Sequence, residues 1–187
     1  LKVLEMWEKE EHYRLNNQVY RNLGNLQFED LSSRWGLDHF GVSTGSAMGD
    51  LDGDGDLDLV VNGFEEPILV YRNDVSTGNA LRIKLKGRAS NSGGIGAKIV
   101  LKTNNGLKQM VRYVTGSRGF MSSSEPTVHF GLGTMDMAEK ITIYWPSGIT
   151  QILQDIPTDF LYVVTEPKLP SQKINQPSLV KSVGTMF

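Results

Sequence analysis

The amino-acid sequence predicts an all-β protein built from two successive parts. Twenty glycines among 187 residues supply many turn positions. Long helical patterns of apolar residues are scarce, whereas short strand-like runs recur between turns rich in glycine and asparagine. A repeated tetrapeptide marks the first third of the chain, and evenly spaced strand-length segments fill the remainder. We therefore expect a first part over residues 1–76, a second over 77–167, and a linker or the start of another module over 168–187.

The bulk composition excludes several classes of function. A formal net charge of −2 offers no basic footprint for nucleic acid. No apolar run approaches the ~18 residues of a transmembrane helix. The absence of cysteine excludes disulfides and thiolate chemistry. Because the sequence starts at Leu1 without a signal-peptide core, we expect it to be an excerpt of a longer chain whose export signal lies upstream.

The first part contains a short repeat with the spacing of propeller blades. The sequence VYRN occupies residues 19–22 and again 70–73, and each copy ends an apolar run and enters a turn. A period of about 50 residues is typical of β-propeller blades. We expect roughly one blade and part of another, which need further blades or a partner to cover their faces. Ahead of them, residues 1–16 are expected to form a short helix or loop.

The stretch AMGDLDGDGDLDLVVNG, residues 47–63, places aspartate at alternate positions. With Asp50 as position 1, the carboxylates at positions 1, 3, 5 and 9, which converge in a calcium loop, belong to Asp50, Asp52, Asp54 and Asp58. Asp56, at position 7, would contribute its backbone carbonyl, and Gly55, at position 6, permits a tight turn. Position 12 is Val61 rather than a bidentate glutamate, so the loop is not an EF-hand.

Converging carboxylates require a compensating positive charge. Two carboxylates about 4 Å apart repel by about 1 kcal/mol in water, and by several times more when they are partly desolvated. Hard oxygen ligands without nearby histidine or cysteine favour Ca²⁺ over zinc or copper. We therefore predict bound Ca²⁺. The alternatives are an acidic turn without metal and a general acid/base pair formed by Asp50 and Asp54, as in a glycosidase.

The second part consists of segments of strand length. Residues 80–87, ALRIKLKG, alternate apolar with basic side chains and predict a strand with one solvated basic face. Further strands are expected at residues 96–103, 107–114, 127–133, 140–146, 150–155 and 160–166. Between the first two of these, Asn105-Gly106 predicts a tight hairpin turn. Regular strand spacing without helices predicts an antiparallel β-sandwich or barrel-like domain.

Both parts resemble known families. YRNLGNLQFEDLS, GDLDGDGDLDLVV and ILVYRN, within residues 17–75, are similar to FG-GAP/VCBS-type propeller repeats. This resemblance implies a Ca²⁺ loop between two blade strands, with ligands from Asp50, Asp52, Asp54, the carbonyl of Asp56, and Asp58. SNSGGIGAKIVL, HFGLG and ITIYWPSGITQ, within residues 79–166, are similar to the ASPIC/UnbV domain. The same pairing of modules occurs in large exported bacterial proteins.

Other motifs have ordinary structural explanations. GVSTG around Ser43 lacks the strand–turn–helix context of a nucleophile elbow. His129 has no buried acid or oxyanion hole that the sequence places beside it. GGIGA, residues 93–97, lacks the third glycine and the helix of a phosphate loop. Trp145 lies in phase with the apolar positions of its strand and is expected in the core.

The sequence thus predicts a non-catalytic, calcium-binding adhesion or interaction segment of a larger extracellular, cell-surface or outer-membrane-associated protein. Its expected partners are other domains of the same chain and a protein or glycan at the cell surface. The loop at residues 115–124, with an apolar tip at Phe120 and Met121, is the candidate contact surface. Two alternatives stay open: part of a carbohydrate-active or other hydrolytic enzyme, and a glycan-binding module that uses the basic strand faces, including Lys84 and Lys98.

Overall fold

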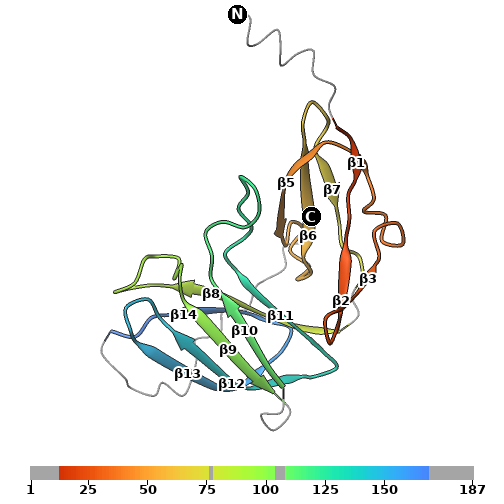
Figure 1. Ribbon diagram of the computed structural model, residues 1–187. Coiled ribbons are helices and arrows are strands. Elements are labelled where there is room, and N and C mark those ends of the chain that lie inside the picture. Colours follow the sequence, from red (N-terminus) through yellow and green to blue (C-terminus); the bar gives the residue numbers. More distant parts are fainter. Residues whose placement is uncertain (1–12, 76–77, 104–107, 169–187) are drawn as a thin grey trace, which may run out of the picture.

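All regular elements in the described residues are β-strands. The structure is a computed structural model that describes residues 13–75, 78–103 and 108–168. Figure 1 shows strands β1 to β7 gathered in one region and strands β8 to β14 in another. The predicted all-β fold is therefore confirmed. The segments expected as a linker or a new module at the end of the chain lie outside the described residues from position 169 onward.

The first part forms three small sheets. Its strands are β1 (Leu15–Asn16), β2 (Tyr20–Gly24), β3 (Gln27–Asp30), β4 (Phe40–Gly41), β5 (Ser43–Gly49), β6 (Asp58–Gly63) and β7 (Leu69–Tyr71). Strand β1 pairs with β4, β2 pairs with β3, and β5, β6 and β7 form an antiparallel sheet in that order. The first VYRN copy overlaps the start of β2, and the second overlaps the end of β7. Residues 15–16, expected as part of a helix or loop, form a short strand instead, and residues 1–12 lie outside the described ranges.

These small sheets bury little apolar surface. Among the described apolar side chains of the first part, those that are buried are Leu31 and Val61. By contrast, Leu26 is 94% exposed, and Ile68 and Val70 are each 62% exposed. Sheets of two or three strands need neighbours to cover their faces. The described strands of the first part therefore leave much of their apolar surface exposed to solvent.

The second part forms two sheets. Its strands are β8 (Asn79–Lys86), β9 (Lys98–Thr103), β10 (Lys108–Tyr113), β11 (Val128–Gly133), β12 (Met137–Tyr144), β13 (Thr150–Pro157) and β14 (Leu161–Thr165). One sheet has the order β10-β9-β12-β13 and the other the order β11-β8-β14. All seven segments predicted as strands are confirmed. The predicted turn at 104–107 lies outside the described residues, but the flanking strands β9 and β10 pair antiparallel.

The two sheets share one apolar core. From Leu81 to Lys86, burial alternates along β8, and Leu81, Ile83 and Leu85 are the buried positions. The larger buried side chains of the other strands are Ile99, Leu101, Phe130, Ile141, Ile143, Leu153, Tyr162 and Val164. Trp145 is 3% exposed and its Nε1 donates to Oε1 of Gln151 at 3.0 Å, which confirms its predicted core position. Burial of each such side chain stabilises the fold by about 1.5–3 kcal/mol.

Of the two expected forms, a sandwich or a barrel-like domain, the second part adopts the sandwich, because its described strands form two separate sheets. One detail differs from the expected antiparallel arrangement. Strand β14 pairs with β8 in parallel, with Tyr162 opposite Ile83. A tight hairpin joins only antiparallel neighbours, whereas β8 and β14 are separated by several other strands. The chain can therefore return to β8 from either direction.

Candidate metal centre

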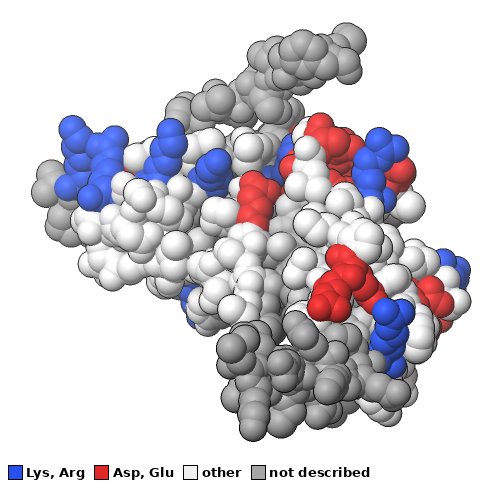
Figure 2. Space-filling model, turned by 90° about the horizontal axis from the view of Figure 1, so that it is seen from above, with Lys and Arg blue, Asp and Glu red and all other residues white. Residues whose placement is uncertain are grey.

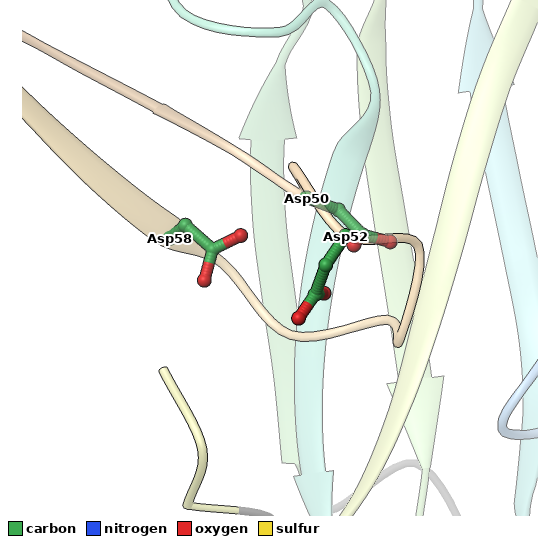
Figure 3. A group of neighbouring side chains, drawn as sticks. All are labelled: Asp50, Asp52 and Asp58. Carbon is green, nitrogen blue, oxygen red and sulfur yellow. The ribbon is translucent and has the colours of Figure 1, made fainter. Parts of the chain in front are cut away.

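The aspartate loop connects two strands of the first part and lies against the second part. Strand β5 ends at Gly49 and β6 begins at Asp58, so residues 50–57 make the connection. Gly53 and Gly55 have φ angles of +82° and +105°, which residues other than glycine rarely adopt. These two glycines let the loop turn back on itself, so that Asp50, Asp52 and Asp58 lie close together (Figure 3).

Three of the five predicted ligand residues come together. One carboxylate oxygen each from Asp50, Asp52 and Asp58 lies within 4.8 Å of the others (Figure 3). Asp54 is not part of this group, and its Oδ1 accepts the N–H of Asp56 at 2.8 Å. The cluster therefore offers hard oxygen donors only, the donor type that Ca²⁺ prefers.

Asp58 is the most firmly held of the three carboxylates. Asp58 is only 2% exposed. Its Oδ2 accepts the N–H of Leu51, and its Oδ1 accepts the N–H of Asn73, both at 2.8 Å. The hydrogen bonds from Asn73 and Leu51 lower the pKa of Asp58. This carboxylate is thus ionised at neutral pH and ties the loop to the segment after β7.

Asp50 is surrounded by donors. Its Oδ1 accepts the N–H of Gly53 at 2.8 Å, and its Oδ2 accepts the N–H of Gly55 at 3.0 Å. The Nη1 of Arg82, from β8 in the second part, lies 2.5 Å from the same Oδ2. The chain itself therefore compensates part of the negative charge for which we predict a bound metal.

The position of Arg82 corrects one expectation. The alternating pattern of β8 placed its basic side chains on a solvated face, and Lys84 and Lys86 are indeed exposed. The side chain of Arg82, however, is only 15% exposed because the aspartate loop covers it. Alternation identifies the outer face of a strand, but it does not show what packs on that face.

The remaining charges near the loop leave it rich in negative charge. Burial raises the pKa of Asp56, and the neighbouring carboxylates of Asp54 and Asp50 raise it further. Burial lowers the pKa of His129, and the charge of Arg82 lowers it further, so this imidazole is mostly neutral at pH 7. A bound cation would relieve the repulsion among the carboxylates.

The motifs considered for catalysis occupy ordinary structural positions. Ser43 begins strand β5 and is not followed by a helix. The hydroxyl groups of Ser122 and Ser123 donate to the backbone carbonyls of Phe120 and Gly116, and Ser124 Oγ accepts the N–H of Met48. The serines near His129 in sequence are therefore engaged with backbone groups.

The loop predicted as a contact surface makes a contact within the chain. The N–H of Glu125 donates to the carbonyl of Met48 at 3.0 Å, and the N–H of Met48 donates to Ser124 Oγ at 3.1 Å. Strand β5 is an edge strand of its sheet, so this loop pairs with an otherwise open edge. The loop tip stays free, with Phe120 68% and Met121 91% exposed.

A cavity of about 390 Å³ lies between the two parts. Residues from the first part, including Met48 and Asp56, line one side, and Arg112, Glu125 and His129 line the other. On the face drawn in Figure 2, several Lys and Arg side chains lie together toward the left edge, whereas Asp and Glu side chains lie toward the right with further Lys and Arg among them.

These features define a propeller-type repeat with an acidic loop, followed by a β-sandwich. In agreement, residues 12–61 match the family described as FG-GAP-like repeat, and residues 87–171 match the family described as ASPIC and UnbV. The chain therefore contains an FG-GAP-like repeat and an ASPIC/UnbV domain, as its sequence motifs predicted. In the ranges that the structure describes, no helix is long and apolar enough to cross a membrane.

The chain is homologous to cartilage acidic protein 1. It is 34% identical to both the Mus musculus and the Homo sapiens proteins over 139 residues, which is 72% of this chain and 21% of each relative. It is 33% identical to the Xenopus tropicalis protein over 111 residues, 58% of this chain and 17% of the relative. The chain thus spans about a fifth of the length of these relatives. Neither family description and none of these names refers to a catalysed reaction.

Proposed function

We propose that this chain is a calcium-binding, non-catalytic interaction segment of a larger extracellular protein. The observation that carries the proposal is the convergence of Asp50, Asp52 and Asp58 within 4.8 Å. The group fits Ca²⁺ because its donors are all carboxylate oxygens. The side chain of Asp54 and the carbonyl of Asp56 would complete the set of ligands. Bound calcium would hold together the two strands that the loop connects.

Two arguments support the proposed extracellular setting, one from the expected calcium affinity and one from the relatives. Loops of this kind on extracellular modules bind calcium with dissociation constants on the order of 10⁻⁴–10⁻³ M, which suits the calcium level outside cells. The relatives are named after cartilage, a tissue rich in extracellular matrix. A place in a bacterial outer-membrane assembly stays a prediction from the sequence, as does a division of the chain at residues 76–77.

Two groups of exposed side chains support a role in interaction. The open apolar faces of the first part, which include Leu26 and Val70, fit against further blades of the same longer chain. The free tip at Phe120 and Met121 offers a small apolar contact for a protein or glycan partner.

Calcium titration by calorimetry, combined with thermal unfolding in calcium and in EDTA, tests the metal site. At a calcium concentration about ten times Kd, we expect about 1.4 kcal/mol of stabilisation and a melting temperature about 3–5 °C higher than in EDTA. Asp52→Asn should abolish both effects because it removes one of the three converging carboxylates. It should leave the fold intact because Asp52 is exposed and accepts only a long hydrogen bond, from the N–H of Asp54 at 3.3 Å. Asp155→Asn, which removes one exposed carboxylate of the second part, is the matched control. A wild-type chain that shows neither heat of binding nor a thermal shift contradicts the proposal.

The cavity favours glycan binding as a second candidate function. Its volume of about 390 Å³ lies in the range of small-ligand sites, and its lining combines Tyr113 with charged side chains such as Arg112 and Glu125. Aromatic and charged groups together suit the mixed apolar and hydroxyl surface of a sugar. A glycan array, followed by Arg112→Gln against Lys86→Gln as a control, would separate this function from protein binding. Binding that survives Arg112→Gln excludes the cavity as its site.

A further inference from the structure

We propose that Arg82 is an internal cation of the aspartate loop that competes with calcium for Asp50, and that calcium therefore loosens one contact between the two parts of the chain. This inference rests on the proposed calcium site. It adds a residue from the second part to that site and makes the contact between the parts responsive to the ion. Neither the aspartate pattern nor the strand pattern indicates such a role.

The contact is close and shielded from solvent. Nη1 of Arg82 lies 2.5 Å from Oδ2 of Asp50, and the two side chains are only 15% and 10% exposed. The guanidinium lies over the loop backbone, because a Cβ atom built on Gly55 would be 3.2 Å from Cζ of Arg82. Gly55 thus serves two purposes: its φ of +105° lets the loop turn, and its missing side chain leaves room for the guanidinium.

Arg82 and a calcium ion cannot both hold Asp50 without repelling one another. Asp50 belongs to the three carboxylates that converge, and its Oδ2 already accepts from both Arg82 and Gly55. A doubly charged ion at that group would lie within a few ångströms of the guanidinium. At roughly 5 Å, even with the screening of water, the repulsion corresponds to a tenfold or greater loss of calcium affinity.

The coupling must act in both directions. If Arg82 lowers the affinity for calcium, calcium weakens the Arg82–Asp50 contact by the same factor. Among the described residues, the other hydrogen bonds between the parts run from the N–H of Glu125 to Met48, from the N–H of Met48 to Ser124, and from the N–H of Asp50 to Glu125. None of them uses a loop carboxylate, so they persist. Calcium would therefore release the loop from β8 while the pairing along β5 keeps the parts together.

The first test compares calcium affinities by calorimetry in one buffer at one salt concentration. Arg82→Gln removes the charge and should tighten calcium binding about tenfold or more. Lys84→Gln, which removes a charge from the same outer face of β8 at an exposed position, should change Kd by less than about twofold. Arg82→Lys keeps the charge and should stay close to wild type. Equal or weaker binding by Arg82→Gln, with normal binding by wild type, overturns this inference and leaves the calcium site standing.

The second test uses the unaltered chain, so it holds even if the Arg82 variants fold poorly. In ¹⁵N NMR spectra of arginine side chains, the Arg82 guanidinium protons should exchange slowly with solvent in EDTA and faster in saturating calcium. Slow exchange in both states, together with normal calcium binding, contradicts the competition. Absence of calcium binding by both wild type and Arg82→Gln defeats the proposed calcium site itself, and this inference with it.

Discussion

Glu166 and Ser90 form two hydrogen bonds across 76 residues of sequence: the N–H of Ser90 donates to Oε2 of Glu166 at 2.8 Å, and its Oγ donates to Oε1 at 2.9 Å. The same carboxylate accepts the N–H groups of Arg88 and Ala89 and the hydroxyl of Ser147. Glu166 is 1% exposed. This buried carboxylate therefore organises the turn after β8 from the far end of the domain.

Replacing Glu166 with glutamine should destabilise the second part by about 2–4 kcal/mol. The glutamine amide keeps the shape but presents donors where the loop already supplies donors, so buried N–H groups lose their acceptor. Urea unfolding at pH 7 measures the change. Asp155→Asn, an exposed carboxylate of the same domain, should shift the free energy of unfolding by no more than about 0.5 kcal/mol. Similar losses in both variants would show that the hydrogen bonds to Glu166 carry no special stability.

The same carboxylate predicts how stability depends on acid. Burial alone would raise the pKa of Glu166, but the hydrogen bonds from Ser147, Ser90 and Arg88 outweigh it and lower the pKa to about 2, from 4.5. Since the pKa is lower in the folded state, its contribution is complete above about pH 4.5. It is lost as the pH falls toward 2, and amounts to up to about 3 kcal/mol. Urea midpoints measured from pH 7 to pH 2.5 should fall more steeply for wild type than for Glu166→Gln. Parallel curves contradict the assignment.

Gly94 is expected to tolerate no side chain. Its φ is +64°, and an added Cβ would lie 2.8 Å from Cβ of Leu85 and 3.3 Å from Cζ3 of Trp145. Gly94→Ala combines backbone strain with overpacking and should lower the free energy of unfolding by about 2–4 kcal/mol. Gly131→Ala is the control, since nothing lies within 4 Å of its added Cβ. If the two variants unfold at the same urea concentration, the space between Gly94, Leu85 and Trp145 is not too small for a Cβ atom, and the prediction is wrong.

Asp58 should matter even without calcium. Because its two oxygens accept from Leu51 and Asn73, Asp58→Asn places an amide donor against a backbone donor and should cost about 1–3 kcal/mol in EDTA. Asp52→Asn should change the metal-free stability by no more than about 0.5 kcal/mol, since Asp52 is exposed. Unfolding in urea with EDTA distinguishes the two. A full effect of Asp58→Asn only in the presence of calcium would reduce its role to that of a ligand.

The strands of the second part were predictable because each of its sheets has one solvent-exposed face. Burial of one face produces alternation such as that of Leu81, Ile83 and Leu85, and this pattern is visible in the sequence of a single strand without knowledge of its neighbours. The pairing of β14 with β8 could not be predicted in the same way. It joins residues about 80 positions apart, such as Tyr162 and Ile83, and no local pattern encodes the direction of such a pair.

In the candidate site, too, local features were predictable and contacts between distant segments were not. The aspartates were predictable because one continuous loop carries them at fixed spacing, and three of them converge. Arg82 and Glu166 were missed since each acts on a loop far away in sequence. The pattern around Arg82 indicated an outward-facing strand position, and the sequence contains no local signal that an outward position is covered.

The parallel pairing of the first and last strands of the sandwich determines how the domain carries tension. The chain enters at Asn79 and departs at Thr165, which pairs with Lys86 about 23 Å further along the strand direction. A force drawing those two points apart slides β8 against β14, so the whole ladder between them is loaded in shear at once. Hairpin ends pulled apart would instead unzip one rung after another. The parallel pairing therefore predicts that the domain resists such a force until the ladder between β8 and β14 breaks as a unit.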